Sequence, residues 1–401
     1  MKDELLTNIL ANDVHEVASN SFLNNNFFTD ALANNLYETK SISKEANEPL
    51  RVGMLRLNNN LGNYTTANLM AYMARQFNIE LYFFTTKDFN PEDKTVRATL
   101  IDGNTQIKKT IPLPKITYDI NGGFYQKEVR TILGNETYFF QYGWGASKRI
   151  INNIMTKDER FKEFLIETHV SENFEHFMSL FKEYHNDVVL KPSNGSLGND
   201  VVRIFSDGVG FTITLKKEQL LLNSVTELQA YYEENFVKRS YVLQPYIVSR
   251  TKYGNPFDIR IHTRRDSEGE FKIIPYPRIG RNPESILSNI AAGGYTMPLV
   301  KFLKEDFGKD WKIIHDKLIY LGNNIPALIQ ASFNKIIFAI GIDVGIQRCD
   351  NSYELKIFEI NTYNPGILSI PIEAAFITLE YLQYLGKCLA NGTFEKFINS
   401  K

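Results

Sequence analysis

The amino-acid sequence predicts an α/β (α+β) protein with more than one domain, and three stretches carry this prediction. Apolar runs at 51–57 and 79–85 enclose a helical segment, and such a strand–helix–strand unit of about 35 residues is typical of a parallel sheet. Two β-branched runs, 188–190 and 201–204, flank a turn rich in glycine and serine, which predicts a hairpin. Alternating residues at 353–361 predict a further strand that ends before an Asn-Pro-Gly turn.

Composition limits the classes of protein that this chain fits. Its 401 residues, 43% of them hydrophobic, are enough for two or three domains. The 45 Lys and Arg residues against 46 Asp and Glu residues give a net charge of −1, so we expect no nucleic-acid partner. No apolar run is long enough to indicate a membrane span, and Cys349 and Cys388 are too few for a disulfide framework or a zinc site. We therefore expect a cytoplasmic protein without a membrane span or a secretion signal.

A small α/β domain is predicted at 50–145. Thr65 or Thr66 caps the helix of the strand–helix–strand unit, and further strand candidates follow at 96–101 and 115–119. The residues before this domain form an Asn-rich arm in which no catalytic pattern stands out.

The chain from 146 onward alternates between helices and strands. Helical patterns occupy 147–163, 174–184, 216–238, 326–340 and 371–385, the fourth of them opened by Pro326. Strand patterns, besides the hairpin and the strand above, occupy 240–248, 257–263 and 271–279. This order suits two further α+β units.

The hairpin at 188–204 is a candidate phosphate site. A flexible loop of glycine and serine can turn backbone N–H groups toward an anion, and Lys191 at its mouth adds a positive charge. Taken alone, an ordinary glycine hairpin with a solvated lysine explains the same residues equally well.

Two strands place polar side chains on one face. Asp258, Arg260 and His262 alternate along one strand and share a face, and Glu359 and Asn361 do so near the end of another. A carboxylate and an amide oxygen two residues apart suit a hard cation with oxygen ligands. The alternative for the second pair is a strand end whose polar groups are satisfied before the turn.

These pieces, in this order, resemble the ATP-grasp superfamily, and most closely its YheC/YheD-like branch of spore-coat-associated proteins. The resemblance covers 50–370. The motifs that carry it are FFTTKDFN (83–90), PLPKITYD (112–119), SKRIINNIM (147–155), VVLKPSNGSLGNDVVRI (188–204), YVLQPYI (241–247), PFDIRIHTRRD (256–266), SNIAAGGY (288–295) and IFEINTYNPG (357–366). Each motif is weak by itself, but their order and spacing together are specific.

The resemblance implies an ATP-grasp fold, in which two α+β lobes clasp ATP and a small parallel α/β pre-ATP-grasp domain precedes them. The chain would then divide into an arm at 1–49, the pre-domain at 50–145, lobe A at 146–243 and lobe B at 244–401. Lobe A would carry the phosphate loop, and lobe B the hinge, the catalytic arginine and the metal site.

The resemblance also implies roles for particular residues, carried over by position. ATP phosphates would be held by Lys148 and Lys191, under a lid that contains Ser193, Gly195, Ser196 and Gly198. Adenine would lie against a hinge made of Gln244, Pro245, Tyr246 and Ile247. The catalytic residues would be Arg260, Arg278 and Asn289, and Mg²⁺ would be held by Glu359 and Asn361.

Some of these residues also have plain structural explanations. Lys148 fits a solvated lysine at a helix start, and Arg278 fits a surface residue of a strand. Arg260 is different, because an arginine between apolar neighbours on a buried strand requires an anionic partner. His262 is expected to be structural.

One position departs from the family pattern. Similar proteins place an Asp twelve residues before the metal-binding Glu, and this chain has Gln347 there, which offers only a neutral oxygen. Asp343 lies four residues earlier, about 13 Å along a strand at ~3.3 Å per residue, so we do not expect it to substitute. The metal site is therefore expected to be weakened.

The leading functional hypothesis is an ATP-dependent ligase that joins a carboxylate to an amine, on small molecules or peptides, through an acyl phosphate with ADP and phosphate as products. Such chemistry needs charge neutralisation and positioning more than a nucleophilic side chain. One alternative is an ATP-grasp kinase acting on a hydroxyl group. The other is a catalytically weak, ATP-binding structural or assembly protein, which Gln347 and the N-terminal arm favour. A homodimer is compatible with each hypothesis.

Overall fold

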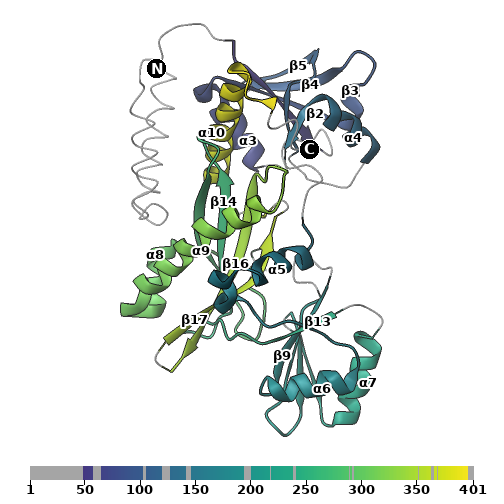
Figure 1. The fold of residues 1–401 in the computed structure, drawn as a ribbon, viewed down its shortest axis with the longest axis vertical. Coiled ribbons are helices and arrows are strands. Elements are labelled where there is room, and N and C mark those ends of the chain that lie inside the picture. Colours follow the sequence, from purple (N-terminus) through teal and green to yellow (C-terminus); the bar gives the residue numbers. More distant parts are fainter. Residues whose placement is uncertain are drawn as a thin grey trace.

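The computed structural model describes residues 48–56, 65–102, 105–119, 127–140, 146–193, 200–216, 218–237, 241–288, 290, 293–350, 352–362, 365–367 and 369–395. Three sheets follow one another along its long axis, with the first at the top of Figure 1 and the second at the bottom. The third sheet lies between them.

The first sheet has seven strands within the described residues, in the order β3-β4-β2-β1-β6-β7, with β5 paired to β4. Their bounds are β1 Leu50–Arg56, β2 Ile79–Thr85, β3 Phe89–Asn90, β4 Thr95–Asp102, β5 Thr105–Pro112, β6 Ile116–Asp119 and β7 Tyr138–Phe140. Strands β2, β1, β6 and β7 are parallel, as the strand–helix–strand pattern predicts. Antiparallel β4, β5 and β3 extend one edge.

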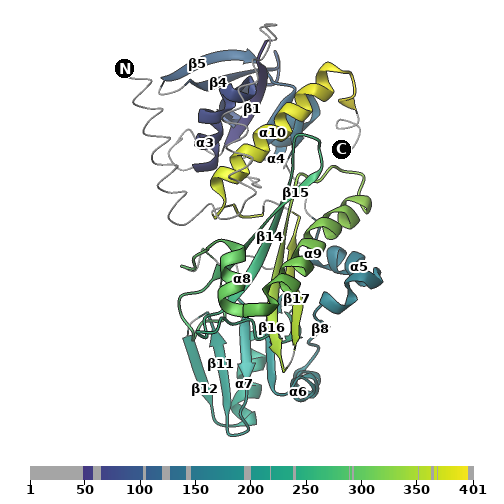
Figure 2. The same cartoon turned by 90° about the vertical axis from the view of Figure 1, so that its left-hand side faces the viewer.

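Helices from both ends of the described chain cover the first sheet. They are α3 (Thr65–Met73), α4 (Lys127–Glu136) and the late helix α10 (Pro371–Ala390). Helix α10 lies beside α3 (Figure 2), and its Leu379 and Leu382 share a core with Val52 and Met54 of β1. Helix α10 therefore packs its buried face on the first sheet, although it lies within the range predicted for lobe B.

The second sheet is antiparallel and has the order β12-β11-β10-β9-β13-β8. Its strands are β8 His169–Val170, β9 Asp187–Pro192, β10 Val202–Phe205, β11 Phe211–Leu215, β12 Glu218–Leu222 and β13 Tyr241–Pro245. Helices α6 (Phe174–Glu183) and α7 (Val225–Asn235) cover one face, where Val188 and Leu190 join their core. Lys191 alternates with these residues and so projects from the opposite face.

The third sheet is antiparallel, in the order β15-β14-β16-β17. Its long strands are β14 Phe257–Arg265, β15 Phe271–Ile279, β16 Ala339–Cys349 and β17 Ser352–Asn361. Their apolar face packs on α8 (Leu299–Phe307) and α9 (Trp311–Ala331), and on the segment formed by α5 (Lys148–Thr156) and a 3-10 helix at Glu159–Phe164. The other face of β14 carries the polar residues.

Two of the helix predictions were wrong. The helix predicted at 326–340 is α9, which ends at Ala331 and holds Pro326 in its interior, because the apolar stripe that packs on the sheet begins at Ile314. The helix predicted at 216–238 is an exposed edge strand, β12, followed by α7, whose N-cap is Ser224. Polar residues on an exposed edge conceal the strand pattern.

Among the described residues, no helix is both long and apolar enough to cross a membrane.

Candidate active site

A row of buried polar side chains runs along β14, as the alternation along this strand predicts. Ile259 and Ile261 point into the core against α9, so Asp258, Arg260 and His262 emerge on the opposite face. All three of these polar side chains are buried, which for charged groups requires partners. Those partners come from the neighbouring strands.

Asp343 on β16 is the partner of Arg260, its opposite residue on β14. The guanidinium donates through Nε to Oδ1 and through Nη2 to Oδ2 at 2.9 Å, and both side chains are buried. Burial by itself would raise the pKa of Asp343, but the cations of Arg278 and Arg260 outweigh burial and hold the pKa below its ordinary value. The anionic partner that the sequence requires for Arg260 is therefore present.

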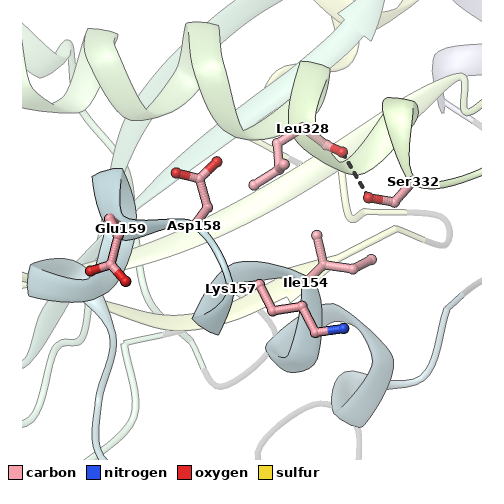
Figure 3. A pocket seen from close by; sticks show the side chains of 6 residues that line it. All are labelled: Ile154, Lys157, Asp158, Glu159, Leu328 and Ser332. Atoms are coloured by element: carbon pink, nitrogen blue, oxygen red, sulfur yellow. Dashed lines mark hydrogen bonds between the residues drawn. The ribbon is translucent and has the colours of Figure 1, made fainter.

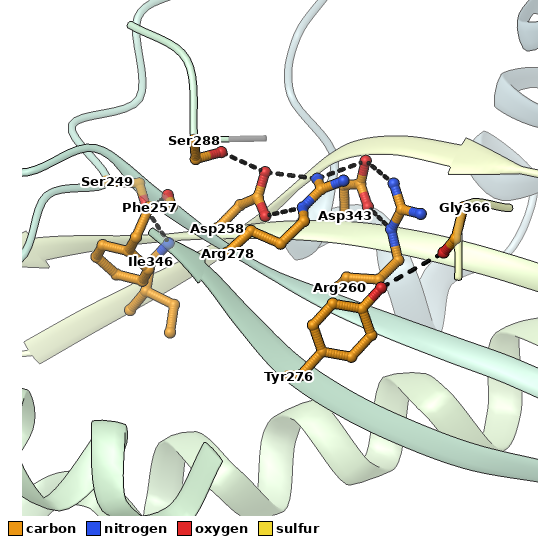
Figure 4. Close-up of polar contacts among 10 residues, drawn as sticks. All are labelled: Ser249, Phe257, Asp258, Arg260, Tyr276, Arg278, Ser288, Asp343, Ile346 and Gly366. Carbon is orange, nitrogen blue, oxygen red and sulfur yellow. Dashed lines mark hydrogen bonds and ion pairs between the residues drawn. The ribbon is translucent and has the colours of Figure 1, made fainter. Parts of the chain in front are cut away.

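Arg278 on β15 joins the same cluster (Figure 4). It donates to both carboxylate oxygens of Asp258 at 2.7 and 2.6 Å, and its Nη2 lies 2.9 Å from Oδ2 of Asp343. Burial would lower the pKa of Arg278, but the two carboxylates hold it well above its ordinary value. With a side chain only 11% exposed, Arg278 is no surface residue.

A second group of charges surrounds Glu359 on β17. Lys148 begins α5 directly after Ser147, the N-cap residue, and its Nζ lies 3.0 Å from Oε1 of Glu359. Lys191, from the second sheet, lies with its Nζ 5.8 Å from the centre of the Phe358 ring. Burial lowers the pKa of Lys191 to about 8, and the nearby carboxylate of Glu359 opposes that shift. Lys148 thus pairs with Glu359, and Lys191 lies near enough for the same carboxylate to act on its charge.

Asp343 and Glu359 bring the two groups together. The β16–β17 register sets Asp343 directly across from Glu359, with an irregularity between Asp343 and Val344. Asp343 therefore lies opposite Glu359, and it stays four residues along β16 from Gln347, as counted in the sequence. Asn361 is the last residue of β17 and pairs with Gly341, two residues along the strand from Glu359.

Gln347 does not belong to this group. It pairs with Glu354 near the far end of the β16–β17 hairpin, and its Oε1 accepts a hydrogen bond from the backbone N–H of Val248 at 2.9 Å. Its role in the structure is to hold the segment after β13.

The predicted hinge lies where β13 leaves the second sheet. Gln244 donates to Thr168 Oγ1 at 2.7 Å, and Pro245 is the last residue of β13. The backbone N–H of Tyr246 donates to Asp187 O at 3.1 Å, and the carbonyl of Ile247 accepts from Ser249.

The Tyr246 ring is held from two sides. The Arg203 guanidinium lies 3.9 Å from its centre, and its hydroxyl accepts from Arg250 at 3.1 Å. Arg203 is itself bound to both oxygens of Asp187 at 2.7 Å. The side chain of Tyr246 is therefore fixed, and its backbone is ordered with it.

Several predicted residues lie outside the described part of the chain. These are Gly195, Ser196, Gly198, Asn289 and most of the arm at 1–49. Ser193 is described, at the residue after β9.

The residues that sequence reasoning did not assign to the site are Asp258, Asp343 and Ser288, whose hydroxyl donates to Asp258 at 2.8 Å. The alternation along β14 singled out Asp258, but the register of β14 with β16 was needed to reveal Asp343, and the path of the chain after β15 to reveal Ser288.

A cavity of about 400 Å³ lies away from these charges (Figure 3). It is open and lined by Ile154, Lys157, Asp158, Glu159, Leu328 and Ser332, near the C-terminal ends of α5 and α9. None of the predicted site residues lines it. Within the described residues, no group of three or more His, Cys, Asp or Glu side chains is placed to hold a metal ion.

A match to a family model establishes the class. The model described as YheC/D-like ATP-grasp matches residues 136–373, more than half of the chain. The chain belongs to this family.

Two curated relatives come from Bacillus subtilis (strain 168). The endospore coat-associated protein YheD is 23% identical over 302 residues, which cover 71% of this chain and 64% of YheD. The endospore coat-associated protein YheC is 20% identical over 317 residues, covering 75% of this chain and 85% of YheC. The chain thus spans less than two thirds of the length of YheD.

Solved structures show distant likeness. D-cycloserine synthetase DcsG is similar with a TM-score of 0.45 and 12% identity, over 83% of this chain and 99% of that one. The C-terminal domain of Pby1 from K. lactis, described as an ATP-grasp enzyme, is similar with a TM-score of 0.43 and 12% identity, over 86% and 95% of the two chains. Family membership rests on the sequence match.

Proposed function

We propose that this protein is an ATP-dependent carboxylate–amine ligase that works through an acyl phosphate and releases ADP and phosphate. The observation that carries this proposal is the meeting of Lys148, Lys191, Arg260 and Arg278 around Asp343 and Glu359, between the second and third sheets. Because these four positively charged side chains outnumber the carboxylates beside them, the group suits a negatively charged polyphosphate ligand.

ATP would lie between the two sheets. Lys148 and Lys191 are the phosphate-binding candidates, and the backbone of 244–247 is the adenine-binding candidate. Lys191 carries a pKa of about 8 in the free protein because burial disfavours its charge, and an anionic phosphate beside it would restore that charge.

The donor atoms at the strand pair fit magnesium. Asp343, Glu359 and Asn361 offer carboxylate and amide oxygens, the ligands that Mg²⁺ prefers, and they lie on the paired strands β16 and β17. Bound there, Mg²⁺ would neutralise phosphate charge. Lys148 now shares Glu359, so we expect its ammonium to move onto a phosphate when the nucleotide binds.

The reaction begins when an oxygen of the substrate carboxylate attacks the γ-phosphorus of ATP. A new P–O bond forms, the bond to the β,γ-bridging oxygen breaks, and ADP leaves. An amine then attacks the acyl carbon, and the C–O bond to phosphate breaks with the electron pair remaining on phosphate. The amine loses a proton, and an amide results.

The arginines supply the charge that this transfer needs. Asp343 accepts hydrogen bonds from Nε and Nη2 of Arg260, and the third guanidinium nitrogen, Nη1, takes no part in this ion pair. The carboxylates hold both guanidinium groups in place before the substrate arrives, so little reorganisation is required during the transfer. No nucleophilic side chain is needed.

A catalytically weak ATP-binding assembly protein is the second candidate. It is favoured by the names of YheC and YheD, both described as endospore coat-associated. The two candidates differ in turnover, and both require ATP to bind.

A thermal melt tests the shared requirement first. The parent and Lys191→Ala are heated with ATP, magnesium, both or neither, and Lys182→Ala, an exposed lysine of α6, is the control. A ligand at a hundredfold over its Kd adds about 2.7 kcal/mol, a visible shift. We expect a shift that needs ATP and magnesium together and that disappears only in Lys191→Ala. No shift in the parent would contradict both candidates.

A screen for ADP release then separates the two candidates. Small-molecule and peptide carboxylates are offered with ATP, magnesium and ammonia or simple amines. A ligase gives ADP, phosphate and a new amide in equal amounts. An assembly protein binds ATP and releases no ADP under any of these conditions.

A further inference from the structure

The segment 281–288, which we call the strap, connects three parts of the molecule. It follows β15, which carries Arg278, and it ends at Ser288. Its contacts reach the hinge, the second sheet and the Asp258–Arg278 pair. Each contact is a hydrogen bond from a described residue.

The hinge end of the strap is held by Arg250. Its Nη1 donates to the carbonyl of Pro283 at 2.5 Å, and its Nη2 donates to the carbonyl of Ser285 at 3.1 Å. The same Nη2 donates to the Tyr246 hydroxyl, so one guanidinium joins the strap to the adenine-binding candidate. Arg203 stacks on the other side of that tyrosine.

The second sheet contacts the strap directly. The backbone N–H of Ile286 donates to the carbonyl of Lys216 at 3.3 Å, in the turn between β11 and β12. The Gln219 side chain on β12 donates to Glu284 at 3.1 Å. A movement of the second sheet against the third would therefore pull on the strap.

The last residue of the strap, Ser288, contacts the Asp258–Arg278 pair. Ser288 donates through Oγ to Oδ2 of Asp258 at 2.8 Å, and Arg278 Nη2 donates to that same oxygen at 2.6 Å (Figure 4). Arg278 has a second acceptor, Asp343, at 2.9 Å. The Ser288 hydroxyl thus helps to fix the orientation of the Asp258 carboxylate, and that carboxylate in turn fixes the Arg278 guanidinium.

We propose that Ser288 is a positioning residue for Arg278 and that the strap links its placement to the seating of the second sheet on the nucleotide. The inference rests on the proposed function. When ATP draws the second sheet toward the third, the strap holds Ser288, Asp258 and Arg278 in the arrangement that phosphoryl transfer requires. An enzyme of this kind gates its chemistry by closure.

Hydrogen exchange tests the link without turnover. The parent is measured with and without a non-hydrolysable ATP analogue plus magnesium, after calorimetry has shown that the analogue binds. We expect amide exchange in 283–288 to slow by about tenfold on binding, as for a segment whose local opening is suppressed. Failure of the analogue to bind would contradict the proposed function itself, and with it the proposed role of the strap. Binding of the analogue without any change of exchange in 283–288 would overturn only the proposed role of the strap.

Kinetics test Ser288. With the carboxylate found by ADP release, Ser288→Ala should lower kcat about tenfold and leave KM for ATP within twofold. Ser288→Thr keeps the hydroxyl and should restore kcat. The control is Ser332→Ala, whose hydroxyl donates to Leu328 within α9. An unchanged kcat in Ser288→Ala, or an equal loss in Ser288→Thr, would overturn the positioning role.

Discussion

Asp343 lies directly across from Glu359 in the β16–β17 pair, while its own carboxylate is bound by Arg260 and Arg278. One carboxylate therefore belongs to both halves of the site, the arginine cluster and the candidate metal ligands. Gln347, at the position where similar proteins were expected to hold an Asp, lies four residues along β16 and binds Val248 instead.

Exchanging charge at these two positions should have unequal effects. Asp343→Asn leaves two buried arginines short of a carboxylate, and we expect it to lower the free energy of unfolding by about 3 kcal/mol. It should also raise the magnesium concentration needed for the ATP-dependent melting shift by tenfold or more. Urea unfolding and melts across a magnesium titration measure the two effects.

Gln347→Asp is the matched comparison for this prediction. It adds a carboxylate at the position expected from the family pattern, but far along the strand from Glu359. We expect no change in the magnesium requirement. A tighter magnesium response in Gln347→Asp would mean that position 347 reaches the metal after all.

Arg260→Ala should remove turnover and leave nucleotide binding in place. Loss of a cation that stabilises the transferring phosphoryl group costs about 10³-fold in kcat, roughly 4 kcal/mol. We expect the Kd for ATP to change by less than about threefold, because Lys148 and Lys191 hold the other phosphates. Calorimetry and ADP release measure the two quantities.

Two further variants make the Arg260 result interpretable. Arg260→Lys keeps the charge but loses the bidentate geometry, so it should recover only part of kcat. Arg348→Ala removes a half-exposed arginine of β16 that pairs with Asp306 of α8, and it should behave as the parent. Full turnover in Arg260→Ala would exclude the catalytic role.

Lys148→Ala should affect binding rather than folding. Its pair with Glu359 involves a lysine side chain that is 46% exposed, so its loss should cost about 0.5 kcal/mol of stability or less. Loss of a phosphate-binding cation should weaken ATP about tenfold, as calorimetry would show. Lys157→Ala, at the other end of the same helix, is the control. Equal ATP affinity in both variants would argue against a phosphate contact at Lys148.

His262 should make the protein less stable in acid. Burial, together with Arg264 and Arg260, holds the pKa of His262 well below 6.5, so it stays neutral in the folded state. The unfolded chain takes up a proton there as the pH falls below about 6.5, so the free energy of unfolding falls by about 1.4 kcal/mol per pH unit. His262→Gln, which cannot take up a proton, should show a shallower acid slope in urea unfolding between pH 6.5 and the folded pKa. Identical slopes in the parent and the variant would show that His262 does not carry this effect.

The sequence predicted most strands and which polar side chains share a face of β14. Period-two alternation along 257–263 placed Asp258, Arg260 and His262 on one face, and the structure has them there. The strand–helix–strand pattern likewise predicted the parallel strands of the first sheet. Such patterns are local, so they are readable without knowing what packs against them.

Pairing across the chain could be decided only by the tertiary structure. The distance from Asp343 to Glu359 depends on the length of the β16–β17 hairpin and on the irregularity beside Asp343, and neither follows from counting residues back from Glu359. In the same way, Lys191 of the second sheet approaches Phe358 and Glu359 of the third only because the chain packs these two sheets together. The chain's local pattern determined which side chains point inward. The register and the packing of the sheets, which minimise exposed apolar surface and unpaired charge over the whole molecule, determined which of them touch.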